Sequence, residues 1–170
     1  DSTAINVAYS FEKYCQPFDS CEYVNMLNKG ILNYHTDLLQ DNSHLNFLGA
    51  AKVTKWLGQY LLDNYPELEH QDQYTCDFWN KKYEKYVDYK ITRFEEKNLY
   101  HNLLLSYGDD FDTKIYITEE IKDNDVLSLI NELHINVEKI PEIEWKGNHY
   151  AMKFQVYSKK TNKLVFEEYD

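Results

Sequence analysis

The hydrophobic period of this chain changes near Gly108–Asp110. Before that point, most apolar residues recur at three- and four-residue spacings, which are typical of amphipathic helices. After it, the segment 113–121 (TKIYITEEI) alternates apolar and polar residues, as a half-buried strand does. The 170 residues are enough for one ordinary domain, or for two small lobes with a real core. We therefore expect an α/β chain with a distinct C-terminal lobe.

Two segments before this change predict helices. The first begins at Asn46, a good N-cap, and ends before Pro66. The second, residues 74–106, is rich in Tyr, Lys and Glu, and a break near Glu96–Asn98 can divide it into two helices. We expect its apolar face to pack on a neighbouring lobe, with an oligomerisation helix as the alternative. The residues expected to form the buried stripe of the first helix are Ala50, Val53, Leu57, Tyr60 and Leu61.

The N-terminal region predicts a helix, a short strand and a polar loop. Residues 3–15 have helical spacing and stop at Pro17, and residues 20–27 (SCEYVNML) are a strand candidate. A helix followed by a strand is the last half of one βα repeat of a parallel sheet. Residues 28–45, which are rich in Asn, Asp, His and Gly, are expected to form a loop.

The C-terminal segment 109–170 predicts a small β-α-β-β lobe. Its first strand is followed by a short helix that Asp123 or Asn124 can cap. Two further strands are expected at 149–157 and 163–168, on either side of a turn. This lobe carries no catalytic signature.

Composition excludes several classes of partner. The formal net charge is −11 and there is no run of basic residues, which argues against binding a phosphate backbone or anionic lipid. No apolar run approaches the length that spans a bilayer. The sixteen tyrosines suit shallow cores and lobe interfaces, and a tyrosine-rich sugar-binding surface is the alternative.

The three cysteines and the scattered histidines predict neither a metal site nor a cofactor. There is no CxxC and no Cys/His spacing of the kind that binds zinc. Cys15 and Cys21 are near enough in sequence to be bridged if the chain turns between them, which leaves either three thiols or one bridge with Cys76 left over. His35 could join His44 and either Asp37 or Asp41 in a metal site, but this spacing matches no familiar pattern. The remaining histidines are expected at the surface or the core edge, namely His70, His101, His134 and His149.

The loop ahead of the first long helix carries the candidate chemistry. Asp41 and His44 are three residues apart, immediately before the helix N-terminus. A carboxylate so placed can accept a hydrogen bond from imidazole Nδ1–H and leave Nε2 as the base. Such a base needs a third group, a Ser or Cys, whose proton it accepts.

Residues 41–52 (D-x-S-H-L-N-x-x-G-A-x-K) resemble the last motif block of SGNH/GDSL-type hydrolases, and bacterial envelope-associated members most of all. Asp41 and His44 match the catalytic Asp and His of that family. Gly49 matches a position where the closing helix approaches its neighbours closely. The segments 23–27 (YVNML) and 36–40 (TDLLQ) resemble the strand and loop that lead into this block, so that the resemblance covers about residues 5–65.

This resemblance implies a flavodoxin-like three-layer α/β/α domain and an enzyme that hydrolyses or transfers acyl groups, commonly acetyl groups on polysaccharides. It also implies an extracellular or cell-envelope location for the intact protein. In such enzymes a Ser in a G-D-S motif after the first strand is the nucleophile, and Gly and Asn residues from middle blocks complete the oxyanion hole.

The chain departs from that pattern because it contains no G-D-S. The nearest imitation is Phe18-Asp19-Ser20, but Ser20 lies too few residues before Asp41 to leave room for the βα units of a parallel sheet. Ser43 is adjacent to His44 and is better interpreted as a loop or cap residue. We therefore expect the nucleophile to come from an upstream segment outside these 170 residues.

Together these patterns predict three parts: residues 1–68 as the C-terminal part of an SGNH-like domain, 69–108 as a helical linker, and 109–170 as a small α/β accessory lobe. The predicted function is the C-terminal portion of a serine esterase or O-acyltransferase acting on acylated polysaccharide, inactive alone. The alternative is a non-catalytic binding module that uses the Tyr-rich helix and the C-terminal lobe. An incomplete sheet would also expose an edge through which two copies can associate.

Overall fold

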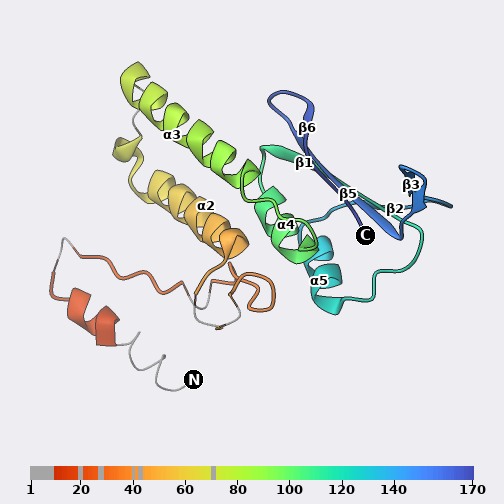
Figure 1. The fold of residues 1–170 in the computed structure, drawn as a ribbon. Coiled ribbons are helices and arrows are strands. Elements are labelled where there is room, and N and C mark those ends of the chain that lie inside the picture. The colour runs from red at the N-terminus through yellow and green to blue at the C-terminus, as the bar shows by residue number, and fades with distance from the viewer. Residues whose placement is uncertain (1–9, 19–20, 27–28, 40, 42–43, 70–71) are drawn as a thin grey trace. The chain divides into compact units, whose positions relative to one another are not determined.

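The computed structural model describes residues 10–18, 21–26, 29–39, 41, 44–69 and 72–170 (Figure 1). The chain divides into two compact units, Asp1–Asn33 and Tyr34–Asp170, which are described separately. Among the described residues, no helix is long and apolar enough to cross a membrane.

In the first unit, residues 10–15 are helical. The strand expected over 20–27 is not formed in its described part, because residues 21–26 have no ladder partner among the described segments. An extended segment needs a neighbouring strand for its backbone N–H and C=O groups, and sequence pattern alone does not supply one. Just before it, Phe18 N donates to Cys15 O at 2.9 Å and Cys21 N donates to Phe18 O at 3.0 Å.

The second unit begins with helices and ends with strands, as the change of period predicts. Its helices are α2 (Phe47–Asn64), the 3-10 helix η1 (Pro66–Leu68), α3 (Gln73–Ile91), α4 (Leu99–Ser106) and α5 (Asn124–Glu132). Its strands are β1 (Phe111–Ile117), β2 (Val137–Lys139), β3 (Glu144–Trp145), β4 (Asn148–His149), β5 (Met152–Ser158) and β6 (Lys163–Tyr169).

The predicted α/β character is confirmed, and the sheet is mixed. Its strand order is β2-β1-β5-β6, in which β1 pairs with β2 in parallel and with β5 antiparallel. Strands β5 and β6 form the expected hairpin. Two features of the lobe are additional to the prediction: the short strand β2, and the separate β3–β4 hairpin. Elements of two or three residues are too short for alternation to mark them.

The core joins α4 and α5 to the central strands (Figure 1). Leu103, Leu129, Phe154 and Val156 are fully buried there, and Leu48 of α2 belongs to the same cluster. The break predicted near Glu96–Asn98 is confirmed, since α3 ends at Ile91 and α4 begins after its N-cap, Asn98.

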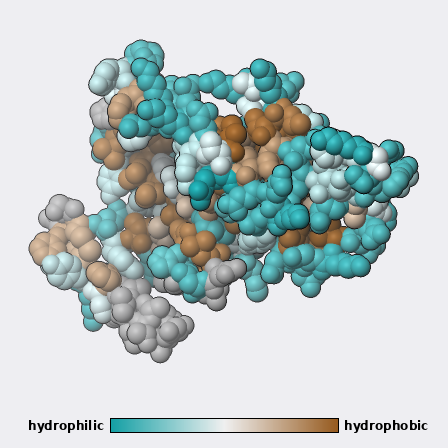
Figure 2. Space-filling view, in the orientation of Figure 1, coloured by the Kyte–Doolittle hydropathy of each residue, from teal (hydrophilic) through white to brown (hydrophobic). Residues whose placement is uncertain are grey.

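The buried stripe expected on α2 is wrong for most of its residues. Ala50 is exposed, and Leu57 and Leu61 are 43% and 37% exposed. The helix instead buries Leu48 and Gly49, in its first turn. Amphipathic spacing marks a face that favours burial, but burial also requires an element that covers this face, and the spacing does not supply one. Apolar side chains around α2 and α3 are consequently open to solvent in Figure 2.

Candidate functional site

Asp41 and His44 are in direct contact. Oδ2 of Asp41 lies 2.6 Å from Nδ1 of His44, and the backbone N–H of His44 donates to Oδ1 of Asp41 at 3.0 Å. An ionised carboxylate only accepts hydrogen bonds, so this contact selects the tautomer that carries its proton on Nδ1. Nε2 is then the basic nitrogen of the ring. The side chains are 75% and 47% exposed for His44 and Asp41, so a second reacting group can reach the ring from solvent.

The backbone on both sides of this pair is closed into a narrow loop. Leu38 and Leu45 form an antiparallel bridge, and Leu39 N donates to His44 O at 2.8 Å. One residue further out, Asn46 N donates to Asp37 O at 3.0 Å. The imidazole is therefore carried by a backbone that is fixed from both ends of the loop.

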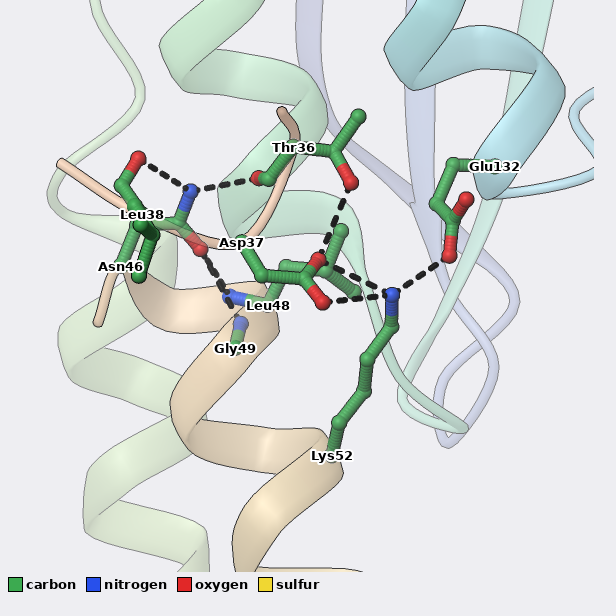
Figure 3. A network of polar contacts seen from close by, with 8 residues as sticks. All are labelled: Thr36, Asp37, Leu38, Asn46, Leu48, Gly49, Lys52 and Glu132. Carbon is green, nitrogen blue, oxygen red and sulfur yellow. Dashed lines mark hydrogen bonds and ion pairs between the residues drawn. The ribbon is translucent and has the colours of Figure 1, made fainter. Parts of the chain in front are cut away.

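Asn46 joins the loop to helix α2 through both ends of its amide (Figure 3). Its Oδ1 accepts from Leu48 N and Gly49 N at 3.0 and 3.1 Å, which is the N-cap that the sequence predicts. Its Nδ2 donates to the carbonyls of Thr36 and Leu38 at 2.7 and 3.2 Å. A Ser or Asp cap could make the first pair of bonds but not the second, so the amide is required to hold helix and loop together.

Gly49 allows the loop to lie against the helix. A Cβ placed there would be 2.3 Å from the carbonyl oxygen of Asp37 and 3.0 Å from its Cβ. The close approach that the motif implies at Gly49 is thus made with the backbone of Asp37. Any larger residue would push the base of the loop away from α2.

Asp37 is fully buried, and its carboxylate is paired with the ammonium of Lys52 (Figure 3). Lys52 of α2 donates to both of its carboxylate oxygens, at 2.9 and 3.0 Å, and Thr36 Oγ1 donates at 3.1 Å. The same ammonium reaches Glu132 at the end of α5, at 2.5 Å. Desolvation disfavours the charged form of Lys52, but the hydrogen bonds to Glu132 and Asp37 outweigh it and raise its pKa.

The structure accordingly brings the two predicted site residues together and explains the rest of the motif as their support. Asn46, Gly49 and Lys52 all act on the segment that leads into the loop. Sequence reasoning missed the role of Asp37 and Glu132. A buried Asp fifteen residues before a helical Lys leaves no local signature, and Glu132 lies eighty residues from its partner.

Ser20 and Ser43, the two serines considered from the sequence, lie outside the described residues. His149 forms an ion pair with Glu142 at 2.8 Å, and no group of three His, Cys, Asp or Glu side chains in the described part of the chain could hold a metal ion. The three cysteines have free thiols, and the side-chain hydrogen bond between Cys15 and Cys21 raises the pKa of the Cys15 thiol.

Comparisons with models of protein families, with curated proteins and with solved structures give no match to this chain.

Proposed function

We propose that this chain is the C-terminal portion of an SGNH/GDSL-type serine esterase or O-acyltransferase, which acts on acylated envelope or extracellular polysaccharide. The single observation that carries the proposal is the 2.6 Å contact between Asp41 Oδ2 and His44 Nδ1. The resemblance of residues 41–52 to the last motif block of that family supports it further.

In this mechanism Asp41 holds the imidazole of His44 in the tautomer that keeps Nε2 basic. Nε2 removes the proton of a serine hydroxyl supplied from outside residues 1–170, and the serine oxygen attacks the ester carbonyl. The imidazolium then returns the proton to the departing sugar oxygen, leaving an acyl-enzyme. Water or a second sugar hydroxyl, deprotonated by the same Nε2, takes the acyl group and releases the serine.

The exposure of Asp41 and His44 favours a mechanism in which this chain supplies the base and another segment supplies the nucleophile. A histidine that is 75% exposed is accessible to a nucleophile from another segment, while its backbone is fixed by the Leu38–Leu45 bridge and the Asn46 amide. Catalytic groups need such fixation because small displacements of the base lose large factors in rate.

The test has a genetic and an enzymatic part. The parent gene should encode an apolar strand ending in G-D-S roughly 150–200 residues upstream, the length of an α/β domain. In the intact protein, His44→Ala and Asp41→Asn should each lower ester hydrolysis by about 10⁴-fold. The chain of 170 residues should hydrolyse p-nitrophenyl acetate no faster than its His44→Ala variant does. Turnover by this chain that disappears in His44→Ala, or a parent gene without such a strand, would overturn the proposal.

A second candidate function is a binding module that uses the Tyr-rich helix and the C-terminal lobe. It is favoured by the exposed aromatic residues of α3, of which Tyr74 and Trp79 are 81% and 63% exposed. Under this alternative, substitution of His44 would leave the esterase activity of the intact protein unchanged, whether or not the intact protein has such activity.

A further inference from the structure

A cavity of about 920 Å³ lies in the second unit, between helices α2 and α3 and the two loops that join α4 to β1 and α5 to β2. Ala50 and Thr54 line it from α2, and Tyr83, Tyr86 and Lys90 line it from α3. Asp41 and His44 are not among its lining residues, so it is a different place from the acid–base pair. Its volume lies at the upper end of the range for small-molecule sites, which suits an extended ligand.

One wall of the cavity is aromatic. The ring centroids of Tyr83 and Tyr86 are 6.5 Å apart, and Tyr86 is 43% exposed. The hydroxyl of Tyr83 lies 2.8 Å from both carboxylate oxygens of Asp110, which fixes its ring. Burial, together with the hydrogen bond and charge of Asp110, raises the pKa of Tyr83 to about 12, so that its ring stays neutral. Fixed, neutral tyrosine rings offer an apolar face with a polar rim.

A buried ammonium forms part of the same wall. Lys90 is only 4% exposed, and its Nζ donates to the carbonyl of Tyr107 at 2.6 Å. Two aromatic rings face the same Nζ, with the centroid of Phe111 at 5.0 Å and that of Tyr86 at 5.7 Å. An ammonium has three donors, so a ligand oxygen can be bound here without displacing the Tyr107 bond.

The charges around the cavity balance, although the chain as a whole carries −11. Its lining contains three cationic side chains, Lys55, Lys90 and Lys159, and three anionic ones, Asp109, Asp110 and Asp112. Neither a strongly anionic nor a strongly cationic ligand is favoured by such a wall. A ligand whose groups both donate and accept hydrogen bonds can use ammonium and carboxylate together.

We propose that this cavity binds a neutral oligosaccharide, with a pyranose face on Tyr86 and its hydroxyl groups between the lysines and aspartates that line the cavity. Sugar hydroxyls donate and accept, and the C–H face of a pyranose packs on an aromatic ring, so the ligand matches both the charge balance and the aromatic wall. Binding here does not require the Asp41–His44 pair to be catalytic.

The test is an NMR titration of the 15N-labelled chain with three neutral tetrasaccharides: cellotetraose, xylotetraose and the tetramer of N-acetylglucosamine. We expect at least one of them to shift backbone signals of the lining residues. Tyr86→Ala should weaken that binding about tenfold, the value of one lost aromatic contact. Thr54→Trp should weaken it as well, because Thr54 is exposed and lines the cavity, so that an indole there takes up part of the space for the ligand.

Tyr89→Ala is the matched control. Tyr89 lies on the same helix and is 48% exposed, close to the value of Tyr86, but it does not line the cavity. It should leave the affinity unchanged. Absence of binding by all three neutral tetramers, an equal loss in Tyr89→Ala, or tighter binding of the deacetylated, cationic glucosamine tetramer would each overturn the proposal. Since no turnover is measured, these outcomes leave the esterase proposal unaffected.

Discussion

Lys52 donates to both carboxylate oxygens of Asp37 at 2.9 and 3.0 Å, although Asp37 is completely buried. Asp37 accepts from Asn46 N through its own carbonyl, at the base of the loop that carries His44. Lys52 also bonds to Glu132 of α5. One side chain of α2 therefore connects the candidate catalytic loop with the α/β lobe that follows it in sequence.

The first prediction concerns the positive charge of Lys52. Lys52→Met should lower the free energy of unfolding by about 3 kcal/mol, because it leaves the buried carboxylate of Asp37 without its cation. Urea unfolding followed by circular dichroism measures the change. Lys55→Met is the control, since Lys55 is exposed on the same helix and should change stability by less than about 0.5 kcal/mol. Adding Asp37→Asn to Lys52→Met should recover part of the loss, and an additive double variant would contradict the pairing.

The second prediction uses two glycines of α2. Gly49→Ala should destabilise the chain by about 2 kcal/mol, because the new methyl would lie 2.3 Å from the carbonyl oxygen of Asp37. Gly58→Ala should stabilise it by about 0.5–1 kcal/mol, since nothing lies within 4 Å of a Cβ there and Ala favours the helix. Thermal unfolding of both variants checks this opposition of sign. Equal effects would show that Gly49 has no special contact.

The comparison of Asn46 with Leu57 shows what the sequence could predict. Asn46 was predictable as an N-cap because capping depends on a few neighbouring residues, and the structure places its Oδ1 on Leu48 N and Gly49 N. The exposure of Leu57 was not, because burial of an apolar stripe depends on an element that covers it. Helix starts are local properties, whereas burial is a property of the assembled fold.

The candidate site divides in the same way. The pairing of Asp41 with His44 follows from their spacing, and the structure brings the two side chains together. The contact of Lys52 with Glu132 spans eighty residues and has no periodic or compositional signal. The roles of Asp41 and His44 in catalysis, and the division of the chain at residues 68 and 108, remain predictions.

The third prediction concerns the tautomer of His44. Asp41→Asn should move the neutral ring from the Nδ1–H form toward the Nε2–H form, because an amide no longer demands a donor at Nδ1. Imidazole 15N chemical shifts measure the proportion. Glu142→Gln is a matched control, since Glu142 lies 2.8 Å from Nδ1 of His149 and should change that ring alone. An unchanged His44 spectrum in Asp41→Asn would show that the carboxylate does not set the tautomer.

The last prediction is the pH dependence that Lys90 gives to stability. Burial lowers the pKa of Lys90 to about 8, with the charge of Asp110 opposing the shift, while the pKa of an unfolded lysine is about 10.4. Between these values the unfolded chain binds more protons than the folded chain, so this group makes stability rise with pH. Below pH 8 both states are charged and the full cost of burying the ammonium remains.

Lys90→Met removes this titration and leaves the other ionisable groups in place. The free energy of unfolding of the wild type, minus that of Lys90→Met, should therefore increase from about pH 8 to about pH 10, and be flat between pH 6 and pH 7. Urea unfolding at five pH values measures the difference, in which the common titrations of the remaining lysines and tyrosines cancel. A difference that falls over this range would mean that the folded state prefers the charged lysine. Lys90 would then be held by Asp110 more strongly than burial opposes it.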